Sequence, residues 1–282
     1  MKKNIKKLSK KTKFHPFVPK KSLGQNFLTS PVVPRWMCEA GIVGKGDIVL
    51  EIGPGTGTLT HEILARAAKV IAIETDKRAV TLLEELFTKE IQEGRLTIVF
   101  GDIRNLELNK LGLKNHSFKI IANIPYYLSG FLLRLFLEKS IQPNTLVFLM
   151  QKEVVARVAR DHQESILSLS VKAFGTPKYV KTVTRGHFNP APKIDSAILQ
   201  ISNINQNNFK TKHDQELFFT LLHLGFGQKR KQLLTNFAHN YLRSELETIF
   251  QNLEIPLTVR AENIPLPLWL ELTTNLAKIG LK

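Results

Sequence analysis

The sequence of 282 residues contains a single cysteine, Cys38. One cysteine can form neither an intramolecular disulfide nor a cysteine-based zinc set. The eight histidines are all at least ten residues apart, so the sequence has no His-x-x-x-His metal pair. No apolar run reaches the roughly 20 residues that a membrane-spanning helix needs, and no apolar signal segment follows the N-terminal lysines. We therefore expect a protein of the reducing cytoplasm, with no metal site and no membrane partner.

Acidic residues are scarce, and none precedes Glu39. With 24 acidic against 40 basic residues the net charge is +16, and nine lysines fall within the first 21 residues. Lys229, Arg230 and Lys231 form a second concentration of positive charge, which we call the basic cluster. This charge predicts a polyanionic partner, with nucleic acid favoured over an anionic membrane surface. Charge alone also leaves open a solvated tail and a solvated helix face.

Strand-like and helix-like runs alternate from Lys45 onward. The expected strands are 47–52, 69–74, 96–100, 118–123 and 145–150, and the expected helices between them include 57–67 and 76–91. Apolar strands separated by helices indicate a parallel sheet covered on both faces. The runs 179–185 and 195–202 are rich in β-forming residues without a helix between them, which favours an antiparallel edge. The fold class is therefore α/β.

Every signal after the polar stretch 203–214 is helical. We place a domain boundary in this stretch. The predicted organisation is a basic N-terminal arm over 1–20, an α/β domain over 21–205, and a helical C-terminal domain over 206–282.

The stretch "EIGPGTGTLT" (51–60) places glycines at 53, 55 and 57 between a predicted strand and a predicted helix. Glycine lets the backbone adopt positive φ and approach a ligand closely. Glu74 and Asp102 end the next two strands, and parallel sheets bind nucleosides at the carboxyl ends of their strands. We predict a crevice in which Glu74 accepts hydrogen bonds from ribose hydroxyls and Asp102 faces an adenine amine. An ordinary structural turn is the alternative for the glycine stretch alone.

The predicted crevice has no Lys or Arg where a pyrophosphate would sit, and several carboxylates are nearby. A dinucleotide-binding loop would also have a small residue at position 58, where this chain has Thr58. These features disfavour dinucleotides and triphosphates. They favour a nucleoside that is neutral or cationic, such as S-adenosylmethionine.

The stretch "ANIPYY" (122–127) ends the fourth predicted strand, beside the crevice. The lone pair of an adenine or cytosine amine is delocalised into the ring, and two acceptors on its N–H bonds can localise it for attack on a sulfonium methyl group. We assign these acceptors to the side-chain oxygen of Asn123 and to the carbonyl of Ile124, which Pro125 holds outward. Tyr126 would stack on the base. The alternative is a strand-ending turn with a capping Asn and a core tyrosine.

From about Lys20 onward the chain resembles the ribosomal RNA adenine dimethyltransferases, most closely the bacterial type that acts on small-subunit RNA. The motifs that carry the resemblance are "KSLGQNFL" (21–28), "EIGPGTGTLT", "IE" (73–74), "GDI" (101–103), "NIPY" (123–126), "LMQKEVVARV" (149–158), "FNPAPKIDSAI" (188–198), "FGQKRKQL" (226–233) and "RAENIPLPLWLEL" (260–272). Together these motifs are highly specific.

The resemblance implies a Rossmann-like class I methyltransferase domain with a small helical RNA-binding domain. It implies dimethylation, from S-adenosylmethionine, of two adjacent adenosines in a hairpin loop near the 3′ end of small-subunit ribosomal RNA. A monomer would act on this RNA or on an immature small ribosomal subunit, in ribosome biogenesis. By position, the donor would be contacted by Asn26, Leu28, Gly53, Glu74, Asp102 and Asn123. The target base would be held by Asn123, Pro125, Tyr126 and Phe188, the last in a proline-bounded loop that suits an exposed stacking aromatic.

The chain departs from the family pattern at two places. Ile166 and Leu167 stand where a Tyr-Gly pair is usual, beside the expected substrate loop. The basic cluster has one arginine where two are usual, so the charge is kept but one planar guanidinium is lost.

Three other functions compete with this interpretation. A macrolide-resistance enzyme that methylates large-subunit RNA would share "NIPY", but the motifs at 226–233 and 260–272 favour the small-subunit type. A non-catalytic ribosome-assembly or transcription factor would keep the fold and the RNA surface, but the intact Asn123 clamp argues for catalysis. Thr58 and the lack of a hydride-site histidine argue against a nicotinamide dehydrogenase.

Overall fold

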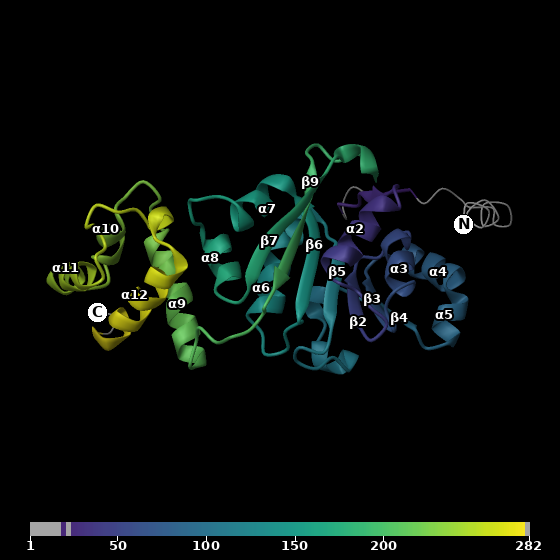
Figure 1. Ribbon diagram of the computed structural model, residues 1–282, viewed down its shortest axis with the longest axis horizontal. Coiled ribbons are helices and arrows are strands. Elements are labelled where there is room, and N and C mark those ends of the chain that lie inside the picture. The colour runs from purple at the N-terminus through teal and green to yellow at the C-terminus, as the bar shows by residue number, and fades with distance from the viewer. Residues whose placement is uncertain (1–17, 21–23, 280–282) are drawn as a thin grey trace.

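The computed structural model describes residues 18–20 and 24–279 as an α/β part followed by a helical part (Figure 1). Most of the basic arm expected over 1–20 lies outside the described residues, because only 18–20 of it are described. In the α/β part, helices flank a seven-stranded sheet. Among the described residues, no helix is long and apolar enough to cross a membrane.

The central sheet has the strand order β4-β3-β2-β5-β6-β9-β7. Its strands are β2 (Ile48–Ile52), β3 (Lys69–Glu74), β4 (Leu96–Phe100), β5 (Lys119–Asn123), β6 (Thr145–Gln151), β7 (Thr176–Val183) and β9 (Ser196–Ser202). The strands from β4 to β6 pair in parallel, and β9 runs antiparallel to both β6 and β7. The predicted parallel sheet with an antiparallel edge is confirmed.

Both faces of the sheet carry apolar side chains, because each face is covered. Successive strand residues alternate between two cores: Leu50 and Ile71 belong to one apolar cluster, and Val49 and Val70 to the other. The helices of the α/β part are α2 (Val32–Ala40), α3 (Thr58–Leu64), α4 (Lys77–Leu86), α5 (Thr88–Gln92), α6 (Ser129–Leu137), α7 (Lys152–Ala159) and α8 (Ile166–Lys172).

The single helix predicted over 76–91 is wrong, because two helices, α4 and α5, meet at Phe87. Phe87 has φ −116° and ψ 27°, which is not helical, and its side chain is buried. A Cβ added at Gly57 would lie only 2.7 Å from the Phe87 ring. The interruption therefore coincides with an aromatic side chain that packs beneath the glycine turn, a contact that local periodicity does not reveal.

A second, two-stranded sheet joins β1 (Phe27–Leu28) to β8 (Phe188–Asn189). In its antiparallel register Leu28 faces Phe188. The short 3₁₀ turns are η2 (Ile103–Asn105), η3 (Leu108–Leu111), η4 (Tyr126–Leu128), η5 (Arg185–His187) and η6 (Ala261–Asn263). This small sheet brings a segment from the start of the described chain against the loop between β7 and β9.

The helical part follows β9, as predicted. It consists of α9 (Lys212–Gly225), α10 (Leu233–Phe237), α11 (Arg243–Asn252) and α12 (Leu266–Ile279). The buried indole of Trp269 on α12 holds it together, with ring centroids 5.8 Å from Phe226 and 6.2 Å from Phe237.

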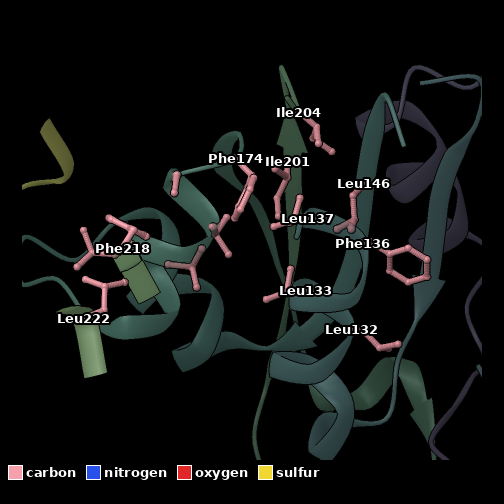
Figure 2. Close-up of a cluster of buried hydrophobic side chains, with 14 of the residues drawn as sticks. Leu132, Leu133, Phe136, Leu137, Leu146, Phe174, Ile201, Ile204, Phe218 and Leu222 are labelled. Atoms are coloured by element: carbon pink, nitrogen blue, oxygen red, sulfur yellow. The ribbon is translucent and has the colours of Figure 1, made fainter. Parts of the chain in front are cut away.

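The apolar core continues from the sheet into the C-terminal helices. Phe174 lies 5.4 Å from Phe209, and Phe209 lies 5.3 Å from Phe218 on α9, measured between ring centroids. Figure 2 shows Phe174, Phe218 and Leu222 in the same cluster as side chains that line the sheet. The division between residues 205 and 206 stays a prediction, and this shared core crosses it.

Candidate functional site

The crevice lies where the strand order changes direction. From β2 the chain moves outward through β3 and β4, then returns to the other side of β2 as β5. Parallel sheets bind ligands at such a switch point, outside the carboxyl ends of the strands. Seven predicted site residues line the crevice: Asn26, Gly53, Glu74, Asn123, Pro125, Tyr126 and Phe188. Leu28 lines a smaller adjoining cavity that shares Gly53 and Asn123, and Asp102 lines neither.

The glycine turn leaves space for a ligand at its first glycine. Gly53 has φ +67°, and a Cβ built there would meet nothing within 4 Å. Gly55, at φ +57°, is crowded instead, because its Cβ would lie 2.7 Å from the ring of Phe27. Gly53 therefore opens towards the crevice, while Gly55 lets an aromatic ring pack over the turn. Phe27, in "GQNFL", is a lining residue that sequence reasoning missed.

Glu74 ends β3 with its carboxylate buried against backbone amides. Its Oε2 accepts from the Gly55 N–H at 3.1 Å, and its Oε1 accepts from the N–H groups of Thr75 and Asp76 at 2.7 and 2.8 Å. The carboxylate thus braces the glycine turn against the turn that follows β3. A carboxylate oxygen can accept more than one hydrogen bond, so Oε2 keeps acceptor capacity.

Asp102 follows β4, but its carboxylate points to Arg104. It accepts from the backbone N–H of Arg104 at 2.9 Å and from the guanidinium Nε at 2.9 and 3.0 Å. The hydrogen bond from the Arg104 side chain is the main cause that lowers the pKa of Asp102. Sequence reasoning missed this pair, in which Arg104 binds the carboxylate that we expected to face an adenine.

Asn123 ends β5 with its amide group fixed by a distant segment. Its Nδ2 donates to the carbonyl oxygen of Asn26 at 3.0 Å. No donor among the described residues reaches its Oδ1, which therefore remains an acceptor at the crevice wall. Ile124 also lines this wall and precedes Pro125, which has φ −58° and ψ 132°.

Tyr126 is held in place at both ends. Its hydroxyl lies 2.8 Å from the hydroxyl of Ser196 on β9, and its carbonyl accepts from the Ser129 hydroxyl at 2.8 Å. Burial raises the pKa of Tyr126. A neutral, hydrogen-bonded phenol keeps the ring fixed at the crevice wall, as a stacking surface requires.

Phe188 lies on the crevice wall, but the expectation that it is exposed is wrong. Its side chain is only 6 % exposed, because β8 pairs with β1 and covers it. Asn26 directly precedes β1 and Leu28 ends it, and the Leu28 carbonyl accepts from the Thr58 hydroxyl at 3.3 Å. Phe188 therefore presents part of a packed ring to the crevice.

Glu51, just before the glycine turn, is buried beside the crevice. It lines the smaller cavity with Gly53 and Asn123, and neither of its oxygens has a hydrogen-bond partner among the described residues. Burial, with a smaller contribution from the charge of Glu74, raises the pKa of Glu51 to about 8. Sequence reasoning missed this group, although its position before the glycine turn was a usable signal.

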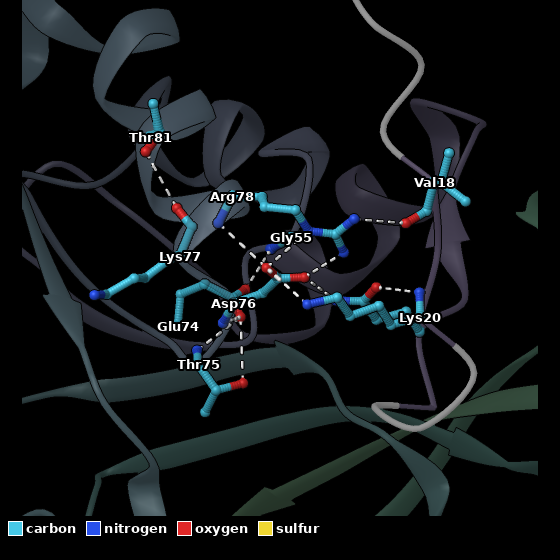
Figure 3. A network of polar contacts seen from close by, with 10 residues as sticks. Val18, Lys20, Gly55, Glu74, Thr75, Asp76, Lys77, Arg78 and Thr81 are labelled. Atoms are coloured by element: carbon cyan, nitrogen blue, oxygen red, sulfur yellow. Dashed lines mark hydrogen bonds and ion pairs between the residues drawn. The ribbon is translucent and has the colours of Figure 1, made fainter.

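A polar network ties the N-terminal segment to the turn after Glu74 (Figure 3). The Gln25 amide donates to Asp76 Oδ2 at 3.3 Å, and the Arg78 guanidinium donates both to Asp76 and to the Val18 carbonyl. The Lys20 ammonium lies 3.9 Å from Asp76. The hydrogen bonds from Arg78 are the main cause that lowers the pKa of Asp76 to about 2.

A broad groove separates α6 from the start of α9. It is lined by the two residues that depart from the family pattern, Ile166 and Leu167, and by Arg104, Arg134, Lys139 and Lys210. The departing pair begins α8, whose first turn is capped by the Ser165 hydroxyl. The basic cluster lies exposed between α9 and α10, and its Lys229 lines a second groove beside Arg157.

The crevice suits a ligand without phosphates. None of the residues that line the crevice or its adjoining cavity is Lys or Arg, while Glu51 and Glu74 both are acidic. Within the described part of the chain, no group of three or more His, Cys, Asp or Glu side chains is placed to hold a metal ion. A cationic nucleoside fits this lining, with Gly53 leaving room and Glu74 offering an acceptor.

A family model described as ribosomal RNA adenine dimethylase matches residues 17–278. The curated relatives include two proteins named ribosomal RNA small subunit methyltransferase A. One, from Dehalococcoides mccartyi (strain BAV1), is 35 % identical over 261 residues, which cover 92 % of this chain and 88 % of the relative. The other, from Fusobacterium nucleatum, is 32 % identical over 260 residues, which cover 91 % of this chain and 97 % of the relative.

Solved structures agree on the fold. A dimethyladenosine transferase from Plasmodium falciparum matches with a TM-score of 0.77 and 26 % identity, over 90 % of this chain and 98 % of its own. The 23S rRNA methyltransferase ErmE matches with a TM-score of 0.71 and 23 % identity, over 89 % of this chain and 100 % of its own. The second likeness speaks for the fold alone.

Proposed function

This chain belongs to the ribosomal RNA adenine dimethylase family, and from this premise we propose that it dimethylates two adjacent adenosines in a hairpin loop near the 3′ end of small-subunit ribosomal RNA. S-adenosylmethionine is its methyl donor. The names of the curated relatives support the small-subunit RNA as the substrate. The observation that carries the proposal is the amide of Asn123, whose Oδ1 is left as a free acceptor at the crevice wall because Nδ2 is bonded to Asn26.

The donor site would be built from residues of three segments. Gly53 gives the donor room, and Glu74 accepts from its ribose hydroxyls. Asn26, directly before β1, and Leu28, on β1, close over it. Asp102 would face the adenine only if its pair with Arg104 shifts. When bound, the donor supplies a methyl group on an electrophilic sulfonium.

The clamp acts on the target amine. The Oδ1 of Asn123 and the carbonyl of Ile124 accept the two amine hydrogens, which localises the nitrogen lone pair and stabilises the positive charge that develops on the nitrogen. Pro125 fixes the direction of the Ile124 carbonyl, and the rings of Tyr126 and Phe188 hold the base between them. The methylated nitrogen is acidic, so it loses its proton afterwards without a strong general base.

The remaining parts of the molecule would bind RNA. We assign RNA contacts to residues 206–282, including the basic cluster, and to the arm over 1–20. The protein would act as a monomer. The place of action would be the cytoplasm, with immature small subunits.

The test compares Asn123→Ala with wild type in single-turnover methylation of a hairpin RNA that carries two adjacent adenosines. Removing one acceptor for transition-state charge should lower the rate by about 10²–10³-fold. RNA affinity should stay nearly unchanged, because phosphate contacts dominate it. Asn144→Ala, at an exposed position directly before β6, is the matched control and should keep the wild-type rate. Dimethylation by Asn123→Ala at the wild-type rate would disprove the clamp.

A further inference from the structure

The second tyrosine of "ANIPYY" has no part in the clamp. Tyr127 is 63 % exposed, in contrast to the hydrogen-bonded Tyr126. One edge of its ring packs on Gly24, where an added Cβ would lie 3.3 Å from Cε1. No hydrogen bond within the described part of the chain involves its side chain. Tyr127 is thus an exposed aromatic ring that the fold does not need for its core.

Tyr127 stands at the boundary between the crevice and the groove. The two residues before it, Pro125 and Tyr126, line the crevice, whereas Tyr127 lines the groove between α6 and α9. Gly24, on which its ring rests, also belongs to the crevice wall. A strand of RNA that leaves the crevice towards the groove would therefore pass this ring first.

Cationic side chains line the groove beside this boundary. Arg104, with its side chain 54 % exposed, lines the same groove as Tyr127. It binds Asp102 through Nε and Nη2, which leaves Nη1 available as a donor. Arg134 lies further along the same groove, and Glu138 and Glu216 are the acids that line it.

We propose that Tyr127 is the stacking platform for the nucleotide next to the target adenosine, and that Arg104 binds the phosphate between the two. The inference rests on the proposed function. A base that enters the crevice leaves its stack, so its neighbour loses a stacking partner, and an exposed ring at the crevice mouth replaces that partner. A strand of fixed polarity presents one neighbour of the target to this ring, so the waiting adenosine stacks there in one of the two transfers and another nucleotide of the loop does so in the other.

The experiment uses a hairpin RNA in which 2-aminopurine replaces the nucleotide on either side of the target adenosine. Stacking on an aromatic ring quenches 2-aminopurine fluorescence. In complexes with wild type and Tyr127→Phe the probe should stay quenched, whereas with Tyr127→Leu and Tyr127→Ala its fluorescence should rise, because no ring replaces the lost stacking partner. With unlabelled hairpin, Tyr127→Leu and Tyr127→Ala should each have a KM for RNA about ten-fold higher than wild type, while kcat and donor affinity stay near the wild-type values. Ile42→Ala, 77 % exposed in the loop before β2 and outside the crevice and the groove, should match wild type in both measurements.

Two results would overturn the inference. One is equal quenching by wild type and Tyr127→Ala for the probe on both sides of the target. The other is a loss in Tyr127→Phe as large as in Tyr127→Ala, which would assign the effect to the hydroxyl. Failure of the proposed function is detected by a separate measurement: wild-type protein would then not methylate the unlabelled hairpin. Donor affinity checks that each variant is folded.

Discussion

Asn123 combines two tasks in one side chain. Its Nδ2 fastens the crevice wall to the carbonyl of Asn26, and the same bond leaves Oδ1 as the amide atom available to the crevice. Asn123→Asp would keep an acceptor for the crevice but lose the donor. One of its two carboxylate oxygens would then face the carbonyl oxygen of Asn26, which repels it. The requirement for an amide at this position therefore follows from the neighbour as much as from the chemistry.

Glu51 makes a testable contribution to pH dependence. Its pKa is raised from about 4.5 to about 8, mainly by burial, so between these values the unfolded chain is ionised while the folded chain keeps the proton. Stability should therefore fall as pH rises from 4.5 to 8 and then level off. In thermal unfolding without donor, the Tm of Glu51→Gln minus the Tm of wild type should therefore increase by about 5 °C or more between pH 5 and pH 8. Parallel pH profiles of the two proteins would mean that Glu51 is ionised in the fold.

At the scale of elements, Leu28 is the only buried residue among those described between Val18 and Leu28. The described residues of this segment are held by the short β1–β8 pairing and by the network around Asp76 and Arg78. The segment nevertheless supplies Asn26, whose carbonyl orients Asn123, and Phe27, whose ring covers Gly55. The geometry of the clamp thus depends on an element that is fastened mainly by polar contacts.

Asp76→Asn should loosen this segment, because a neutral amide weakens the charge-assisted bonds from Arg78 and the attraction of Lys20. Such bonds are worth about 1.5–3 kcal/mol, so hydrogen exchange at residues 24–28 should become about ten-fold faster or more. The methylation rate should fall with it. Glu93→Gln, which weakens an exposed pair with Arg95, is the control and should leave exchange at 24–28 unchanged. Unchanged exchange in Asp76→Asn would show that the β1–β8 pairing alone holds the segment.

At the scale of the whole molecule, one apolar core fixes the crevice relative to the C-terminal helices. The aromatic contacts from Phe174 through Phe209 to Phe218 join the two parts beneath the groove. The crevice and the basic cluster are therefore held at a set separation on one rigid frame. An RNA that contacts both would be positioned by the frame before its target base enters the crevice.

Replacing Lys229, Arg230 and Lys231 by Gln should weaken RNA binding in a salt-dependent way. If each contacts one phosphate, the slope of log affinity against log salt should become shallower by about 2. Fluorescence titrations with the hairpin RNA at several salt concentrations measure this slope. The control replaces three exposed lysines that line neither the crevice nor the groove, Lys89, Lys110 and Lys114. An equal slope in both variants would remove the basic cluster from the interface.

The sequence by itself determined the features that local patterns encode. Apolar runs between helical runs predicted the parallel sheet, and the glycines after β2 and the Asn-Ile-Pro stretch after β5 predicted which strand ends line the crevice. These features are readable because alternation, glycine conformations and proline geometry act over a few residues.

Only the tertiary structure decided how the site residues meet. The bond from Asn123 to Asn26 spans 97 positions, the pairing of β8 with β1 buries Phe188, and Phe87 interrupts a helix to pack under Gly57. The capture of Asp102 by Arg104, two positions away, also needed the structure, because sequence spacing does not say which partner a side chain chooses. Such choices depend on which surfaces the fold brings together, and the free energy of packing them is set by partners far apart in the chain.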